Sequence, residues 1–140
     1  VSIGCKPGYP IITRQGQALM KNTDWVEMYL ETILILKNRK GSVRSVDIVE
    51  ERNYAKSSVS RAVNLLQKKG YISIDHSGEI TLTPSGSAKA NDVYERHRVL
   101  TDVLMRIGAN RASAEDNACR IEHVITPELF ELIKNFAKKN

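Results

Sequence analysis

The chain has 140 residues, of which 41% are hydrophobic and 26% are charged, a composition typical of one small folded domain or of two that share a core. No apolar run approaches the roughly 18 residues that a membrane-spanning helix needs, and the N-terminus lacks a secretory signal, so we expect a cytoplasmic protein without membrane contact. Two cysteines, Cys5 and Cys119, are too few for a disulfide-stapled fold, and we therefore expect Cys119 to be a free thiol.

The formal net charge of +5 comes from one stretch of the chain. Between residues 37 and 69, nine basic residues stand against three acidic ones, whereas residues 1–36 are balanced and residues 70–140 carry a charge of −1. A localised basic surplus is expected of an element that binds a polyanion such as nucleic acid. The alternative is an ordinary solvated helix surface.

The first elements of the chain are an extension and a helix. Residues 1–23 are rich in Gly and Pro without a sustained hydrophobic period, which predicts a loosely ordered extension. A helix is predicted from residue 24 to about residue 38, with Asp24 as its N-cap. Its apolar stripe consists of Trp25, Tyr29, Ile33 and Leu36. Met28 and Glu31 lie on another flank of this helix.

A helix-turn-helix is predicted next. Ser45 is expected to cap a short helix that ends near Asn53, and a second helix begins at Lys56. Val59, Val63 and Leu66 are expected to face inward. The outward face is small, polar and basic, as in a recognition helix, because arginine can read guanine and asparagine can pair with adenine. The residues predicted to contact DNA are Lys56, Ser57, Ser58, Ser60, Arg61 and Asn64.

Two short alternating segments follow the second helix. Residues 71–74 and 79–82 are predicted to form a hairpin around a turn at residues 75–78. A hairpin in this position is a wing, and His76 at its tip is expected to meet solvent or phosphate. Residues 24–83 are therefore predicted to be a winged-helix DNA-binding domain.

Three helices are predicted in residues 84–140. Thr83-Pro84 opens a long helix that carries His97 and stops at Gly108, and Thr126-Pro127 opens the last helix. Ser113 is expected to cap the helix between them, with Glu115 and Asp116 in its first turn. The apolar positions from about Val93 to Phe136 exceed what a winged helix can cover, which predicts dimerisation through these helices.

The segment Ala118–Val124 is a candidate metal site. If it is helical, Cys119, Glu122 and His123 stand at i, i+3 and i+4 and share one face, which brings three types of metal ligand together. The alternative is a small buried cysteine beside a Glu–His surface pair. Met28 and Glu31 lie on the first predicted helix, and His97 lies on the long helix that begins at Pro84. They favour the metal site, because these two helices can bring further donors to one point.

Several motifs together resemble the iron-dependent repressor family, of the diphtheria toxin repressor and manganese transport regulator type. The resemblance extends from about Asp24 to Phe136 and depends on the order and spacing of the motifs. They are Met28–Glu31, Ser57–Arg61 with Lys68–Ile72, Leu82–Gly86, Arg96–Arg98 and Ala118–Val124.

The resemblance implies a mainly α fold with a small β-hairpin, in which an N-terminal winged helix precedes a C-terminal helical dimerisation domain. It implies a homodimeric repressor of metal-ion uptake genes that binds a double-stranded palindromic DNA operator when activated by metal. The implied primary metal ligands are Met28, Cys119, Glu122 and His123. The implied residues of a second site are Glu31, His97 and Glu115, where Glu115 replaces the histidine of iron-type members.

The sulfur ligands favour Fe2+, with Mn2+ possible and Co2+, Ni2+ or Zn2+ expected to bind in vitro. Two other functions stay open at this point. One is a winged-helix transcription factor without metal control, in which Met28, Cys119 and His123 are core residues. The other is a hydrolytic metalloenzyme, which the sequence disfavours because it contains no nucleophile motif or phosphate loop.

Overall fold

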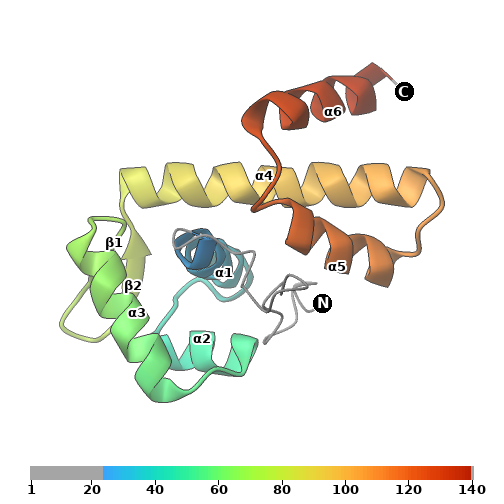
Figure 1. Cartoon of the computed structure of the whole chain (residues 1–140). Coiled ribbons are helices and arrows are strands. Elements are labelled where there is room, and N and C mark those ends of the chain that lie inside the picture. Colours follow the sequence, from blue (N-terminus) through green and yellow to red (C-terminus); the bar gives the residue numbers. More distant parts are fainter. Residues whose placement is uncertain (1–23, 140) are drawn as a thin grey trace, which may run out of the picture. The chain divides into compact units, whose positions relative to one another are not determined.

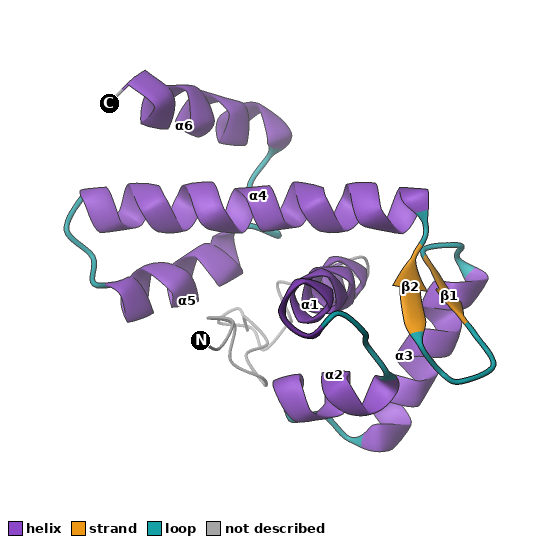
Figure 2. Cartoon of the chain, turned by 180° about the vertical axis from the view of Figure 1, so that it is seen from behind, coloured by secondary structure: helices purple, strands orange, loops and turns teal. Residues whose placement is uncertain are grey.

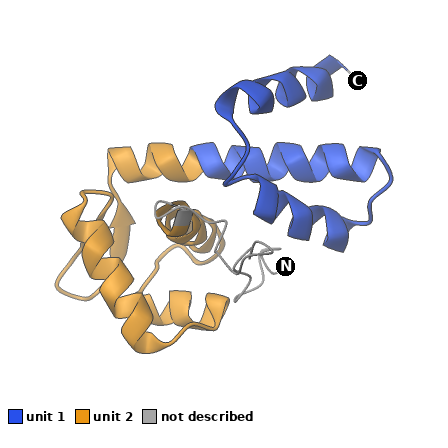
Figure 3. Ribbon diagram, in the orientation of Figure 1, with its two compact units in different colours: residues 1–22, 92–140 blue, residues 23–91 orange. Residues whose placement is uncertain are grey.

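The computed structural model describes residues 24–139, which form six helices and one two-stranded hairpin (Figures 1 and 2). The predicted N-terminal extension lies outside the described residues. The described residues form two compact units, an N-terminal unit of residues 24–91 and a C-terminal unit of residues 92–139 (Figure 3). The elements are α1 (Asp24–Lys40), α2 (Ser45–Arg52), α3 (Lys56–Lys68), β1 (Ile72–Ile74), β2 (Ile80–Leu82), α4 (Pro84–Arg106), α5 (Arg111–Ile121) and α6 (Pro127–Lys139).

Helix α1 supplies much of the core of the N-terminal unit. Tyr29, Ile33 and Leu36 are buried, as the apolar stripe predicts, and Leu30 is buried beside them. Trp25 meets Tyr29 edge to face, with ring centroids 5.9 Å apart. The helix ends after Lys40, slightly later than predicted. The expected cap by the side chain of Asp24 lies outside what the structure describes.

Helices α2 and α3 form the predicted helix-turn-helix, joined at Asn53 in the left-handed conformation. The predicted cap at Ser45 is wrong, because Arg44 is the N-cap of α2. Asp47 Oδ2 accepts a hydrogen bond from the Arg44 backbone amide at 2.8 Å, which starts the helix one residue earlier. Burial opposes ionisation of Asp47, but hydrogen bonds from Lys40 and from the Arg44 amide outweigh it and lower its pKa.

Helix α3 divides its faces as the sequence predicts. Val59, Val63 and Leu66 are buried against the core of the N-terminal unit. Every residue predicted to contact DNA is exposed, from Lys56 at the start of the helix to Asn64 in its third turn. The packing of the apolar face therefore leaves the polar face available to a partner.

The predicted wing is an antiparallel hairpin. Its register pairs Ile72 with Leu82, Ser73 with Thr81 and Ile74 with Ile80. The carboxylate of Asp75 closes the turn by accepting hydrogen bonds from the Ser77 hydroxyl at 2.6 Å and the Glu79 amide at 3.0 Å, and these bonds lower its pKa. His76 at the tip is exposed, which fits the predicted contact with solvent or phosphate.

The caps of the later helices follow the predictions at two of three places. Thr83 Oγ1 accepts from the Gly86 amide at the start of α4, and Thr126 Oγ1 accepts from the Leu129 amide at the start of α6, both at 3.2 Å. The predicted cap by Ser113 is wrong. Asn110 caps α5 by accepting from the Ser113 amide at 2.8 Å, so that α5 begins at Arg111. Within residues 24–139, no helix is sufficiently long and apolar to cross a lipid bilayer.

Candidate metal centre

Glu122 is the C-cap residue that follows α5, and its side chain is completely buried. Its amide donates to the carbonyl oxygen of Ala118 at 2.9 Å, which continues the helical hydrogen bonding by one residue. Helix α5 ends at Ile121, so Glu122 and His123 lie in the turn that follows it. The condition stated for the segment Ala118–Val124, that it be helical, is therefore met only as far as Ile121.

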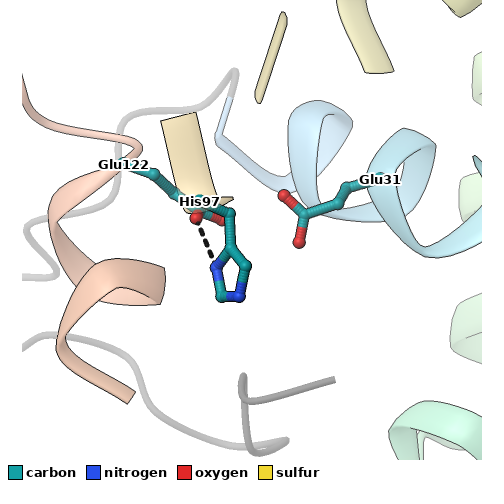
Figure 4. A group of neighbouring side chains, drawn as sticks. All are labelled: Glu31, His97 and Glu122. Carbon is teal, nitrogen blue, oxygen red and sulfur yellow. Dashed lines mark hydrogen bonds and ion pairs between the residues drawn. The ribbon is translucent and has the colours of Figure 1, made fainter. Parts of the chain in front are cut away.

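Each carboxylate oxygen of Glu122 is close to an imidazole. Oε2 lies 2.9 Å from Nδ1 of His97, in the middle of α4 (Figure 4), and Oε1 lies 3.3 Å from Nε2 of His123. The side chains of His97 and His123 are only 11% and 5% exposed. The C-terminal unit thus encloses a carboxylate between two histidines, in an arrangement that we call the His–Glu–His cluster.

Arg96 secures the turn that holds Glu122. Its Nη1 donates to the backbone carbonyl of Glu122 at 3.2 Å, and its Nη2 binds the carboxylate of Asp92 at 2.9 Å. Because Arg96 and His97 are neighbours on α4, two successive residues of that helix hold the backbone and the side chain of Glu122. This arrangement orients the carboxylate before any ligand arrives.

The His–Glu–His cluster has the donor chemistry of a divalent transition-metal site. Imidazole nitrogen and carboxylate oxygen both bind Fe2+, Mn2+ and Zn2+, and a buried carboxylate costs free energy unless positive charge neutralises it. Glu122 and His123 belong to the predicted primary set, whereas His97 was assigned to the second site. The structure brings both histidines to the carboxylate of Glu122.

Cys119 is the sulfur donor predicted on the same segment. It is disulfide-bonded in the structure, so the expectation of a free thiol is wrong for this state. The other cysteine of the chain, Cys5, lies outside the described residues. Only a reduced Cys119 can supply a thiolate to a metal.

Met28 and Glu31, the candidate ligands on α1, belong to the N-terminal unit. Glu31 is buried and is the third side chain drawn in Figure 4, and Met28 is partly buried. The sulfur of Met28 accepts a hydrogen bond from the hydroxyl of Tyr54 at 3.4 Å. Glu115, the remaining second-site candidate, pairs instead with Arg111, whose Nε is 3.1 Å from its carboxylate.

Sequence reasoning overlooked Arg52 and Tyr54. Arg52 is 2% exposed and donates from Nε to the hydroxyl of Thr32 at 2.9 Å, although an arginine at the end of α2 was counted among the basic residues of the polyanion-binding stretch. Its spacing of four from the buried Ile48 was an available signal, because residues so spaced share a helix face.

Comparison with known families identifies both halves of the chain. Residues 21–79 match the N-terminal DNA-binding domain of the iron-dependent repressors, and residues 83–139 match their metal-binding and dimerisation domain. The chain belongs to the iron-dependent repressor family. It is a metal-dependent transcriptional repressor, with the winged helix described above as its DNA-binding element.

Three relatives illustrate the similarity. The regulator MntR of Lysinibacillus sphaericus is 33% identical over 101 residues, which cover 72% of this chain and 73% of MntR. The diphtheria toxin repressor of Corynebacterium diphtheriae is 31% identical over 110 residues, which cover 76% of this chain and 47% of that protein. A solved manganese-dependent transcriptional repressor in complex with manganese superposes with a TM-score of 0.73 at 25% identity, over 82% of this chain and 53% of that one. This chain thus spans about half the length of the diphtheria toxin repressor and of the solved manganese-dependent repressor.

Proposed function

We propose that this repressor senses a divalent transition metal at Glu122 and His123, joined by Met28 and by reduced Cys119, and silences genes of metal-ion uptake. Its physiological metal is Fe2+, and Mn2+ is the second candidate. Glu31, His97 and Glu115 are the candidates for a second site. The observation that carries this proposal is the burial of Glu122 between two histidines, because such a carboxylate is well placed to receive a cation.

The proposed regulatory step is a change in the population of the DNA-binding state. Ligands from α1 and from the end of α5 belong to different units, so one ion bound to both sets favours the arrangement that it bridges. Shifting a two-state equilibrium from 1:99 to 99:1 requires about 5.5 kcal/mol of differential binding free energy. A few coordinate bonds can provide this free energy.

The proposed DNA ligand is a palindromic operator in the cytoplasm, bound by a homodimer. Two copies related by a twofold axis present two α3 helices, which match two half-sites of a palindrome. The metal serves as a regulatory ligand rather than as a catalytic ion. The alternative is a winged-helix factor in which the His–Glu–His cluster is a structural hydrogen-bonded group.

A metal titration of DNA binding tests the proposal. A duplex is first selected from a random library by the metal-loaded protein, and we call it the selected duplex. Reduced, anaerobic protein is then titrated with Fe2+ or Mn2+ while binding is followed by fluorescence anisotropy. We expect affinity to rise with either ion. Equal affinity for the selected duplex with metal and with chelator would favour the metal-independent factor. A separate assay of the metal-loaded protein with ester and phosphoester substrates tests for an enzyme, which hydrolysis would favour.

The choice of metal should change when the sulfur ligands are replaced. Thioether and thiolate donors prefer Fe2+ over Mn2+, whereas Mn2+ gains most from oxygen donors. We therefore expect Met28→Asp combined with Cys119→Glu to lower the Mn2+ concentration for half-maximal binding to the selected duplex, relative to the Fe2+ concentration. If the unmodified protein already responds to less Mn2+ than Fe2+, the argument from soft ligands does not apply to this site.

Arg61 is the residue of α3 that we expect to read bases. It is exposed, and arginine can bind the edge of guanine through two hydrogen bonds. Arg61→Ala should weaken binding to the selected duplex by about 1 to 3 kcal/mol and leave the dimer intact. Gln67→Ala, at an exposed position nearer the end of α3, is the matched control. Equal losses on the selected duplex and on random DNA would show that Arg61 contacts only phosphate.

A further inference from the structure

Two residues that flank the turn of the helix-turn-helix are both connected to Met28 on α1. Asn53 makes this turn, with a φ of 56° and a ψ of 42°. Arg52 precedes it as the last residue of α2, and Tyr54 follows it, two residues before α3 begins at Lys56. All of these residues belong to the N-terminal unit.

Arg52 reaches Met28 through Thr32. Its Nε donates to Oγ1 of Thr32 at 2.9 Å, and the same hydroxyl donates to the carbonyl oxygen of Met28 at 2.8 Å. Arg52 and Thr32 are both buried. Burying a guanidinium is costly, and a leucine at this position could pack without that cost. Through these two hydrogen bonds, the arginine ties the end of α2 to the turn of α1 that carries Met28.

Tyr54 reaches Met28 directly. Its hydroxyl donates to the sulfur of Met28 at 3.4 Å, and its ring packs against Tyr29 with centroids 5.9 Å apart. The ring contact fixes the direction of the hydroxyl, and the hydroxyl in turn orients the thioether, which is a weak acceptor. The position of the sulfur is thus linked to the residue that leads into α3.

We propose that Tyr54 is a positioning residue that couples metal occupancy at Met28 to the setting of recognition helix α3. The inference rests on the proposed function, because it requires the sulfur of Met28 to be a metal ligand. A sulfur that donates an electron pair to a cation is a poorer acceptor, so coordination weakens its hydrogen bond from Tyr54. The hydroxyl then stabilises the metal-free state alone.

The consequence for DNA binding follows from the place of Tyr54 in the chain. Tyr54 is followed by Ala55, the N-cap of α3, and then by the exposed first turn of that helix. Release of its hydroxyl acts on the turn that presents Ser57 and Ser58, two of the residues predicted to contact DNA. Arg52 meanwhile keeps the end of α2 attached to α1.

The test compares Tyr54→Phe with the unmodified repressor, with both proteins reduced and with Co2+ as the metal probe. Phenylalanine keeps the ring against Tyr29 and removes only the hydroxyl. The Co2+ concentration for half-saturation, measured by calorimetry without DNA, should fall by about two- to tenfold, which corresponds to one net hydrogen bond. The ratio of affinities for the selected duplex with and without Co2+ should shrink by the same factor.

Thermal unfolding separates this coupling from a merely structural role. Tyr54→Phe should melt at a lower temperature than the unmodified protein without metal, and the difference should vanish at saturating Co2+. Tyr29→Phe removes the hydroxyl of the adjoining ring and should leave the half-saturating Co2+ concentration unchanged. An equal loss of melting temperature for Tyr54→Phe with and without Co2+ would overturn the inference.

Met28→Leu distinguishes failure of this inference from failure of the proposed function. If Met28→Leu leaves the affinity for Co2+ unchanged, Met28 is not a ligand, and both the proposed ligand set and the coupling are wrong. If Met28→Leu weakens Co2+ binding but Tyr54→Phe equals the unmodified protein in metal affinity and melting, the coupling alone is wrong.

Discussion

Glu122→Gln should abolish the response of the repressor to metal. Glutamine has nearly the same shape as glutamate, but it lacks the negative charge and replaces one carboxylate oxygen with a donor. One of the two imidazoles that now face a carboxylate oxygen, 2.9 and 3.3 Å away, would then face an amide NH2 group. We expect metal affinity to fall by at least about 100-fold, since even residues outside the ligand shell typically cost 10- to 100-fold.

The measurement is competition for Fe2+ or Co2+ against a chelator of known affinity, with binding to the selected duplex recorded in parallel. Glu128→Gln is the matched control, because it makes the same chemical change at an exposed position in the first turn of α6. Circular dichroism establishes that both variants are folded. Unchanged metal affinity in folded Glu122→Gln would show that the His–Glu–His cluster is structural.

Leu132→Asp should convert the homodimer into monomers. Helix α6 attaches to α4 through one side, where Phe130 is buried, Lys134 binds Glu95 at 2.8 Å and Arg106 donates to the carbonyl of Ala137 at 2.8 Å. The opposite side of α6 exposes a stripe of large apolar side chains. They are Leu129, Leu132 and Phe136.

We propose that a second copy of the chain covers this stripe, in keeping with the dimerisation domain that residues 83–139 match. Burying a leucine side chain stabilises an interface by roughly 1.5 to 3 kcal/mol. A twofold interface contains each substitution twice, so the loss is about 3 to 6 kcal/mol per dimer before any cost of burying the new charge. Dimerisation should therefore weaken by two or more orders of magnitude.

Sedimentation over a range of protein concentrations measures this effect. Lys138→Asp is the control, because it introduces the same carboxylate on a flank of α6 away from Leu129 and Leu132. We expect this variant to remain dimeric. A Leu132→Asp protein that stays dimeric at low micromolar concentration would place the dimer interface elsewhere, and the exposed Ile107 after α4 is the next candidate.

The fold of the DNA-binding half could be predicted closely because its signals are local. The spacing of Val59, Val63 and Leu66 determines which face of α3 is buried, and the alternation in residues 71–74 and 79–82 determines the hairpin. Errors arose at helix starts. Asn110 and Ser113 can both serve as N-caps, and only the bond from the Ser113 amide to Asn110 shows which one does.

The sequence by itself determined that Glu122 and His123 are adjacent residues of ligand type, because adjacency is a local property. Only the tertiary structure decided that His97, 25 residues earlier, meets the same carboxylate, and that Arg52 is buried rather than available to DNA. The physical reason is that these contacts depend on how helices pack against one another. Periodicity shows that a helix has a buried face, but not which polar side chains will be enclosed there.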